Sequence, residues 1–423
     1  SAAPEASAQT GRAPVKAGAA DSKPDRFDLN RRRAAQAELT PAQTELVARL
    51  TEEMATRFPT SMCRTQENRR ALADPRTAAG FRRDWNNLVF TVVVERSSGA
   101  RLHDLDGNEL IDLVNGFGQT AFGHAPDFVT KAVAAQLEKG FAIGPQTPLA
   151  YEVARKFLDL TGHERVTFCN TGSEAVMAAM RVARSVTGRD TVVTFKGDYH
   201  GQFDEVLVKG RTTGDPTALP AVTGVPAPSV SNMVVLGYGA PEALDWIREN
   251  RSEIAAILVE PVQSRHPELR PRAFCQELRA IATECGAALI LDEVVTGFRV
   301  APGGIQQLWG IEADLATYGK VVGGGLPVGV LAGRARFMDA LDGGYWSFGD
   351  ASVPEVSPTF FAGTFVRHPL VLAAMSAVLD HIVNETGHDL YDRVAPRTTQ
   401  LQEALNDILE DRGLPRAFTG FSS

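Results

Sequence analysis

The sequence predicts an α/β protein with a parallel sheet that has helices on both faces. Between residues 166 and 292, short apolar runs alternate with amphipathic segments of helical spacing. This alternation is typical of β-α-β units, in which each crossover helix packs on one face of the sheet. The last run, residues 287–292, is almost wholly apolar, as expected of a strand buried on both faces. It ends in Asp292, and open α/β sheets bind their ligands at the carboxyl ends of strands.

The order of the predicted elements supports this fold class. Strands are predicted at residues 166–169, 191–195, 234–236, 255–260 and 287–292. Helices are predicted between them at residues 174–186, 241–249 and 272–284, and two more follow at 368–384 and 390–411. One further short run, residues 315–318, precedes Lys320 and a glycine-rich turn.

The residues before this sheet predict a linker, a helix and a small antiparallel subdomain. The first 25 residues are rich in Ala, Gly, Pro and Ser, and we expect a flexible linker there because they can bury little apolar surface. Thr40 and Gln43 form a capping box around Pro41, which predicts a helix over about 41–57. The charged residues 64–83 are expected to be irregular or partly helical. Apolar runs then predict a meander at 90–95, 100–105 and 109–114, and helices at 127–138 and 148–160.

Composition excludes several classes of function. A chain of 423 residues, 44% hydrophobic and 22% charged, is long enough for two or three domains. Its net charge of −8 argues against a nucleic-acid partner or a membrane surface, both of which require a basic face. No apolar run reaches the length of a membrane span. The four scattered cysteines and eight histidines predict reduced thiols in the cytoplasm, no disulfide and no metal site.

Asp292 and Lys320 are the strongest candidates for chemistry. Each follows a predicted buried strand, so both are expected at the ligand-binding edge of the sheet. A carboxylate can hold a protonated pyridine nitrogen, and a lysine can form a Schiff base with a carbonyl carbon. Pyridoxal 5'-phosphate (PLP) makes both of these demands. For either residue alone, a structural aspartate or a surface lysine is the simpler interpretation.

Residues 170–174 lie between a predicted strand and a predicted helix. Unpaired amides at a helix N-terminus, together with the Ser173 hydroxyl and the small Gly172, could bind one phosphate. The simpler alternative is a plain capping box between Thr171 and Glu174.

Two more strand ends carry polar residues. In residues 198–201 (Asp-Tyr-His-Gly), Tyr199 or His200 could lie flat against a ring, although such a pair is more often packed in a core. Residues 260–263 (Glu-Pro-Val-Gln) place Glu260 and Gln263 at the same edge. Buried polar groups without partners are costly, so their recurrence at four strand ends favours a ligand site.

Together these motifs resemble one known family. The matching residues are 170–175 (Asn-Thr-Gly-Ser-Glu-Ala), 199–201 (Tyr-His-Gly), 260–262 (Glu-Pro-Val), 291–299 (Leu-Asp-Glu-Val-Val-Thr-Gly-Phe-Arg), 318–320 (Tyr-Gly-Lys) and 363–364 (Gly-Thr). Over roughly residues 85–420, the chain resembles class III (fold-type I) PLP-dependent aminotransferases, close to the glutamate-1-semialdehyde aminomutase branch. It is more narrowly similar to aminotransferase domains of hybrid polyketide/nonribosomal-peptide synthases in residues 263–271, 316–327 and 360–369.

This resemblance implies the fold of fold-type I PLP transferases, a mostly parallel seven-stranded sheet flanked by helices, plus a small α+β domain. We therefore expect a flexible linker at 1–39, an N-terminal helical extension at 40–84, the N-terminal part of the small domain at 85–145, the large PLP-binding domain at 146–366, and the start of the C-terminal small domain at 367–423. Because relatives continue past the position of Ser423, the small domain is expected to be incomplete.

The resemblance also implies roles at the PLP ring. Lys320 would form the Schiff base and Asp292 would pair with the ring nitrogen, and these two are the expected catalytic residues. Val294 would pack on one face of the ring. Tyr199 would stack on the other face, with His200 beside it.

The implied phosphate cup combines two subunits. Gly172 and Ser173 would hold the phosphate, and Thr364 of the partner subunit would complete the cup. Glu260 would support the ring region. No arginine is identified for the carboxylate of the amino donor, and the candidates Arg299 and Arg367 are more often structural residues.

The implied activity is that of an aminotransferase in natural product biosynthesis, which acts as a homodimer with shared active sites. It would move an amino group from an amino acid donor to a carbonyl substrate, which is a β-ketoacyl chain on a carrier protein in the synthase-type relatives and a free carbonyl compound in others. Two alternatives stay open: a glutamate-1-semialdehyde-type aminomutase, and a catalytically silent PLP-fold module for dimerisation or docking. A nucleotide-binding Rossmann protein is disfavoured because residues 323–325 do not form the G-x-G-x-x-G motif.

Overall fold

The protein is described by a computed structural model that covers residues 38–78, 81–211, 216–384 and 389–422. It divides into two compact units. Of the described residues, the first contains those between 38 and Glu53 and between Pro75 and Val89, and the second contains Met54–Asp74 and those from Phe90 onward. The predicted linker at 1–39 lies almost wholly outside the described residues, and the other predicted domain boundaries remain predictions.

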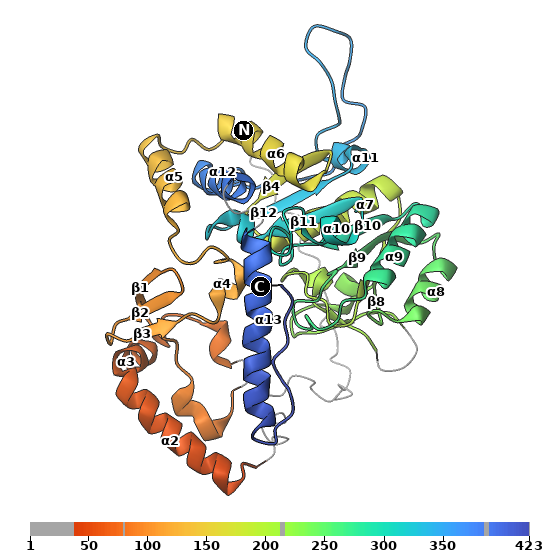
Figure 1. The fold of residues 1–423 in the computed structure, drawn as a ribbon. Helices are drawn as coiled ribbons and strands as arrows, with labels where there is room; N and C mark the ends of the chain where they lie inside the picture. The colour runs from red at the N-terminus through yellow and green to blue at the C-terminus, as the bar shows by residue number, and fades with distance from the viewer. Residues whose placement is uncertain (1–37, 79–80, 212–215, 385–388, 423) are drawn as a thin grey trace, which may run out of the picture. The chain divides into compact units, whose positions relative to one another are not determined.

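The second unit is built on a seven-stranded sheet, which confirms the predicted fold class (Figure 1). The strand order is β4-β12-β11-β10-β9-β5-β8. Six of these strands were predicted, and their bounds are β4 Arg165–Cys169, β5 Thr191–Phe195, β8 Met233–Leu236, β9 Ile254–Val259, β10 Ala288–Asp292 and β11 Leu315–Gly319. Strand β12 (Gly329–Gly333) was not predicted, and it runs antiparallel to both β11 and β4. The other neighbouring pairs are parallel.

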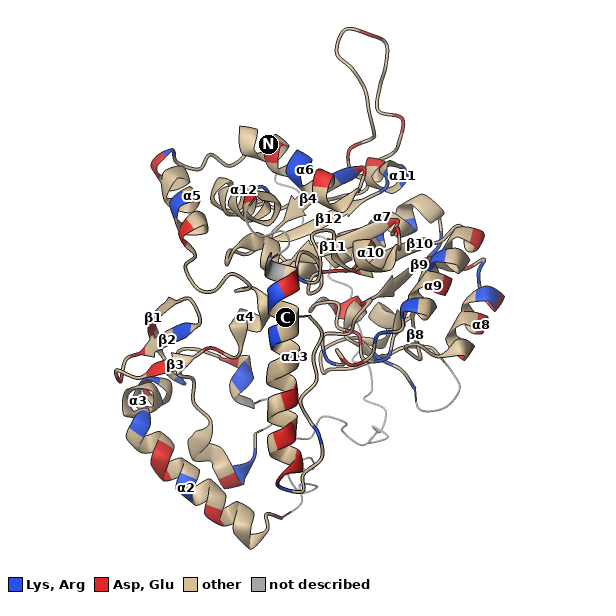
Figure 2. Ribbon diagram, in the orientation of Figure 1, with Lys and Arg blue, Asp and Glu red and all other residues tan. Residues whose placement is uncertain are grey.

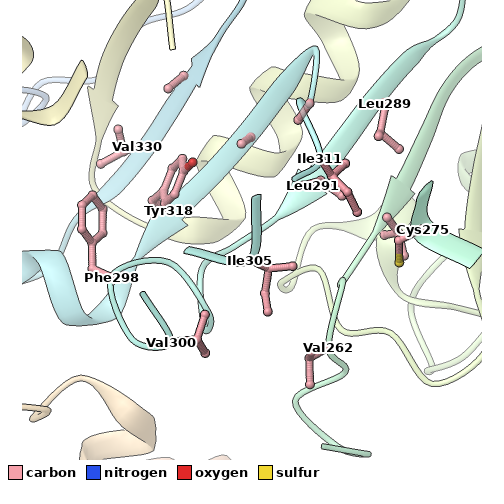
Figure 3. Close-up of a cluster of buried hydrophobic side chains, with 14 of the residues drawn as sticks. Val262, Cys275, Leu289, Leu291, Phe298, Val300, Ile305, Ile311, Tyr318 and Val330 are labelled. Atoms are coloured by element: carbon pink, nitrogen blue, oxygen red, sulfur yellow. The ribbon is translucent and has the colours of Figure 1, made fainter. Parts of the chain in front are cut away.

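Both faces of the sheet are buried by helices. Side chains alternate along β10, because successive residues of a strand point to opposite faces. Ala288 and Ile290 belong to the apolar cluster that includes α7 (Gly172–Thr187). Leu289 and Leu291 belong to the cluster that includes α9 (Arg272–Cys285), which is drawn in Figure 3. The near-continuous apolar run of residues 287–292 is therefore explained by burial on two sides.

The longer helices follow the predicted apolar periodicity. Besides α7 and α9, the longer helices of the second unit are α5 Asp127–Glu138, α6 Pro148–Thr161, α8 Pro241–Glu249, α12 Pro369–Asn384 and α13 Asp389–Glu410. The short elements, none of which was predicted, are α4 Asn115–Gly118, α10 Gly304–Trp309, α11 Ala335–Met338, β6 Val208–Lys209, β7 Leu219–Pro220, and 3-10 turns at Asp204–Val206, Ala227–Val230, Lys320–Gly323 and Asp339–Leu341.

The predicted helix near the N-terminus is confirmed as α2 (Pro41–Arg57). Its capping box is present, because the Thr40 amide donates to Gln43 Oε1 at 2.9 Å and the Gln43 amide donates to Thr40 Oγ1 at 3.3 Å. The charged region that follows is partly helical, with α3 at Pro59–Asn68 and 3-10 turns at Pro75–Ala78 and Arg83–Leu88.

The predicted meander exists, but two of its strand positions were wrong. Its strands are β1 (Val94–Ser98), β2 (Arg101–Asp104) and β3 (Glu109–Ile111), all antiparallel. The first strand begins at Val94, because the amide of Val93 donates to Ser61 Oγ at 3.0 Å. The third strand ends at Ile111, because the Asp112 carboxylate accepts hydrogen bonds from the Val114 and Asn115 amides and turns the chain.

Residues 343–358 form an exposed loop, here called the arm, that extends away from the sheet beside α11 (Figure 1). Its base is closed because the amides of Glu355 and Val356 both donate to Gly343 O, at 3.0 and 3.2 Å. The arm carries Tyr345 and Phe348, which are 86% and 92% exposed. Exposed apolar side chains gathered on one loop are typical of an interaction surface.

Lys and Arg are interspersed with Asp and Glu over the helices that flank the sheet (Figure 2). The described part of the chain has no helix of a length and apolarity that would let it cross a bilayer. Cys169, Cys275 and Cys285 are buried free thiols, and Cys63 is an exposed one.

Candidate active site

Asp292 and Lys320 are brought to the same edge of the sheet. Asp292 ends β10, where it pairs in register with Thr317 of β11. Lys320 follows the last residue of β11 and has a φ of +45°. A non-glycine residue in this left-handed region is strained, and such strain is concentrated at functional sites.

The Lys320 amine has a lowered pKa. Burial is the largest cause, and the positive charge of Arg299 lowers the pKa further. The carboxylates of Asp292 and Glu260 act in the opposite direction, which also shows that both lie within electrostatic range of the amine. The neutral, nucleophilic form of Lys320 is therefore more populated than it would be in water.

The Asp292 carboxylate is fixed by three neighbours. Oδ1 accepts hydrogen bonds from the Val294 amide at 3.1 Å and from the Thr317 hydroxyl at 3.2 Å. Oδ2 lies 2.8 Å from Nδ1 of His200. Asp292 is buried, so these contacts hold its orientation and satisfy its oxygens.

The start of α7 has the form of a capped helix N-terminus. The Glu174 amide donates to Thr171 Oγ1 at 3.2 Å, and Glu174 Oε2 accepts from the Asn170 amide at 2.7 Å. Half of the predicted capping box is therefore present: Thr171 caps the helix, but the Glu174 carboxylate binds the Asn170 amide instead of the Thr171 amide. This cap leaves the amides of Gly172 and Ser173, which have no acceptor within the helix, suited to an anion. The two interpretations are compatible.

Glycines let the start of α7 approach Val294 and the strand end before Lys320 closely. A methyl group built on Gly172 would lie 2.9 Å from Val294 Cγ2, and one built on Gly319 would lie 3.5 Å from Val294 Cγ1. Val294 therefore lies between the start of α7 and the residue before Lys320. On the other side, Gly201 has a φ of +105° and packs directly on Ser173.

Tyr199 and Glu260 are joined in the structure. The Tyr199 amide donates to Glu260 Oε2 at 2.7 Å. The Tyr199 ring is 45% exposed and has the Arg265 guanidinium 5.3 Å from its centroid. Burial raises the pKa of Glu260 to about 7, and the nearby Asp198 and Asp292 carboxylates contribute to the rise.

Thr364 and Arg367 are both exposed in the single chain. Thr364 follows Gly363, on which a built methyl group would lie 3.6 Å from Asn170 Nδ2. Arg367 lines a cavity with Tyr151 and Arg165.

The sequence analysis did not predict the partners of three residues of this site, Arg299, Asp198 and Gln263, although it named Arg299 as a candidate for the donor carboxylate and placed Gln263 at this edge. Arg299 is buried, donates from Nε to Val295 O at 3.0 Å and from Nη2 to Gly118 O, and so acts as a support for the backbone near Lys320. Gln263 Nε2 donates a hydrogen bond to Asp198 Oδ1, and the other oxygen of Asp198 lies 3.3 Å from Nε2 of His200. Asp198 was visible in the sequence as the residue before Tyr199, but only the fold shows its partners.

The assembled groups fit PLP. An amine of lowered pKa, a fixed carboxylate, helix amides for one phosphate and small residues between them lie at one sheet edge. These are the groups that the aldehyde, the ring nitrogen and the phosphate of PLP require.

Comparison with known proteins agrees with this geometry. A family model described as "Aminotransferase class-III" matches residues 83–416. This chain belongs to the class III aminotransferase family. Glutamate-1-semialdehyde 2,1-aminomutase of Archaeoglobus fulgidus is 38% identical over 319 residues, which cover 75% of this chain and 72% of that protein.

Solved structures of other aminotransferases have the same fold. A transaminase with bound PLP is 31% identical, with a TM-score of 0.73 and coverage of 88% of this chain and 82% of that one. A β-phenylalanine aminotransferase from Variovorax paradoxus is 27% identical, with a TM-score of 0.73 and coverage of 90% and 81%. This class III aminotransferase is thus a fold-type I transaminase enzyme with PLP as its cofactor.

Proposed function

We propose that this enzyme moves an amino group from an amino acid donor to a carbonyl substrate, and that this substrate is a β-ketoacyl chain on a carrier protein in polyketide/nonribosomal-peptide biosynthesis. The observation that carries the transfer chemistry is the position of Lys320 and Asp292 at one edge of the sheet. The choice of a β-carbon is supported by the similarity to an aminotransferase named for β-phenylalanine. Sequence similarity to synthase domains supports the carrier-bound acceptor.

Lys320 is proposed to bind the cofactor and to move the proton. Bound PLP supplies an electron sink for the bond that breaks at the substrate carbon. The donor amine would take the place of Lys320 on the cofactor, and the freed Nζ atom would then take a proton from the substrate carbon and deliver it to the cofactor carbon that keeps the amino group. Its lowered pKa increases the fraction of amine that is ready to act as a base.

Asp292 is proposed to hold the proton on the ring nitrogen. Its Oδ1 is fixed by the Val294 amide and the Thr317 hydroxyl, so the carboxylate does not have to reorganise during the reaction. Val294 and Tyr199 are proposed to cover the two ring faces. Gly172 and Ser173 are proposed to bind the phosphate.

The active enzyme is proposed to be a homodimer in the cytoplasm, with Thr364 of the partner subunit in the phosphate cup. Two exposed apolar surfaces support the dimer. One is the arm with Tyr345 and Phe348, and the other comprises Leu113 and Phe117, which are 83% and 68% exposed. The second surface adjoins the site, since a methyl group built on Gly118 would lie 3.8 Å from Lys320 Cδ. Surfaces of this kind are buried when a second copy binds.

A glutamate-1-semialdehyde-type aminomutase is the second candidate, and the comparisons favour it over the carrier-bound acceptor. The Archaeoglobus fulgidus relative carries this name and is 38% identical. An aminomutase uses the same lysine and aspartate but moves the amino group within one molecule. A catalytically silent module is disfavoured, because the chain belongs to an enzyme family and has both Lys320 and Asp292.

Dependence on an external donor separates the two candidates. The enzyme with PLP is incubated with a carrier-bound β-ketoacyl substrate and nitrogen-15-labelled amino acids, and in parallel with glutamate-1-semialdehyde alone. We expect the label in a β-amino acyl product, found by mass spectrometry, and only when donor is present. If the enzyme converts glutamate-1-semialdehyde without a donor and forms no labelled acyl product, the proposed aminotransferase activity is wrong and the protein is an aminomutase.

A further inference from the structure

His200 lies between two carboxylates. Its Nδ1 is 2.8 Å from Asp292 Oδ2, and its Nε2 is 3.3 Å from Asp198 Oδ2 and 3.0 Å from the Thr194 hydroxyl. All three side chains of this Asp-His-Asp group are buried. Nδ1 therefore has a carboxylate oxygen at hydrogen-bond distance, while Nε2 has the Thr194 hydroxyl as its hydrogen-bond partner and the Asp198 carboxylate at ion-pair distance.

Asp198 is itself held from the far side. Its Oδ1 accepts from Gln263 Nε2 at 2.6 Å, and its Oδ2 accepts from the Glu260 amide at 3.3 Å. Gln263 is anchored in turn, because the same nitrogen donates to Lys196 O at 3.0 Å. The chain of contacts runs from the end of β9 through Asp198 and His200 to Asp292.

The charge balance of this group favours a protonated imidazole. The ionisable groups that face His200 are Asp198, Asp292 and, at longer range, Glu260. Burial lowers the pKa of His200, but the hydrogen bonds and charges of Asp198 and Asp292 outweigh it and raise the pKa to about 10. A buried carboxylate without a cation is costly, so each of the two aspartates gains from this proton.

We propose that Asp198 is a positioning residue that clamps His200 against Asp292, so that both ring nitrogens donate and the Asp292 carboxylate is locked towards the cofactor ring. The inference rests on the role of Asp292 given above. In this arrangement Asp198 neutralises His200, and the Asp292 charge remains for the ring nitrogen. A purely structural Asp198 would satisfy Gln263 and the Glu260 amide and would leave the charge of His200 unaffected.

The proposal is tested by the protonation state of His200. The full chain is labelled with nitrogen-15 histidine and studied by long-range proton–nitrogen NMR, with and without PLP. The His200 signals are assigned from the His200→Gln spectrum or from contacts with the Thr194 methyl group. We expect both His200 nitrogens to be protonated from pH 6 to pH 9 in the wild type. An unprotonated His200 nitrogen in the wild type at neutral pH overturns the proposal even if no variant folds.

Two variants separate charge from packing. Asp198→Asn keeps the size of the side chain but removes its charge, and we expect the His200 midpoint to fall by about two pH units or more into the neutral range. Thr194→Val removes the hydroxyl partner of His200 Nε2 and changes no charge, so we expect His200 to stay protonated. We also expect Asp198→Asn to raise the PLP dissociation constant about tenfold, because the clamp on Asp292 is lost.

The outcomes distinguish the clamp from the proposed function. A His200 midpoint that is equal in Asp198→Asn and the wild type refutes the clamp, while PLP binding and turnover by the wild type would still support the proposed function. Conversely, a wild type that does not bind PLP refutes the proposed function, and the ligand-free spectra still decide whether Asp198 charges His200.

Discussion

Lys320 occupies a backbone conformation that few non-glycine residues adopt, and the strand before it explains how that conformation is held. Tyr318, two residues earlier, is fully buried. Its hydroxyl lies 2.8 Å from His163 Nε2 and accepts from Gln306 Nε2 at 2.7 Å. Anchoring of β11 at this point fixes where Lys320 leaves the strand, so a residue with no contact to the reaction helps to position the residue that carries it out.

His163 gives this anchor a pH dependence. Burial lowers the pKa of His163 from 6.5 to about 4. The unfolded chain therefore binds a proton between about pH 6.5 and pH 4 that the folded chain does not, and stability falls as the pH drops through this window. A shift of 2.5 units corresponds to about 3 kcal/mol of stability lost at the acid end.

The contribution of His163 to the pH dependence of stability is measured with His163→Gln. The glutamine can still form a hydrogen bond with the Tyr318 hydroxyl but cannot be protonated. We expect the free energy of unfolding of the wild type to fall by about 3 kcal/mol more than that of the variant between pH 7.5 and pH 4. Urea titrations of both proteins at the two pH values give this difference. Parallel pH profiles for the two proteins would show that His163 does not contribute.

At the scale of elements, the turn after β5 brings the residues that follow it against the start of α7. Gly201 has a φ of +105°, and a side chain there would collide with Ser173. We expect Gly201→Ala to cost about 2–4 kcal/mol, because a left-handed backbone and an overpacked contact each add about 1–2 kcal/mol. PLP affinity should fall as well, because Ser173 would be displaced.

Gly188→Ala is the matched control. Gly188 also has a positive φ, of +66°, but a methyl group there would meet open space at the far end of α7. We expect it to cost about 1 kcal/mol without any change in PLP affinity. Unfolding by urea and titration with PLP give both values. Equal losses in the two variants would mean that contact with Ser173 is unimportant.

The elements also show how far sequence reasoning reaches. Helices with clear apolar periodicity, such as α5 and α8, were predicted with the bounds that the structure has. Strand β12 was missed because its five residues begin and end with glycine and carry no alternation. Asp292 and Lys320 were found because each follows an apolar strand. The Asp198–His200 contact was not, because Asp198 and His200 lie in one turn whose path the sequence does not determine.

At the scale of the whole molecule, the arm is the feature that a single chain leaves unexplained. Besides its exposed aromatic residues it contains Asp350 and Glu355 and no basic residue (Figure 2). In the proposed dimer, the second copy would cover these aromatic residues. The other exposed apolar surface, around Phe117, lies next to Lys320, because a methyl group built on Gly118 would lie 3.8 Å from Lys320 Cδ. A shared active site would then depend on assembly.

The proposed role of the arm in the dimer interface is tested by the double substitution Tyr345→Ser and Phe348→Ser. We expect the molar mass from light scattering to shift from dimer towards monomer and transaminase activity to fall with it, because apolar area buried between copies stabilises the dimer. Leu401→Ser, which changes a 54% exposed residue of α13, is the control and should remain dimeric. A dimeric, active double variant would remove the arm from the interface.

The central claim is that one lysine and one aspartate at a single sheet edge hold PLP between them. The most direct measurement is reduction of the PLP-loaded protein with borohydride, followed by peptide mass spectrometry to locate the trapped cofactor. We expect the pyridoxyl group on the peptide that contains Lys320, and its loss in Lys320→Ala. A pyridoxyl group on another lysine, or a wild type that traps none, would contradict the claim.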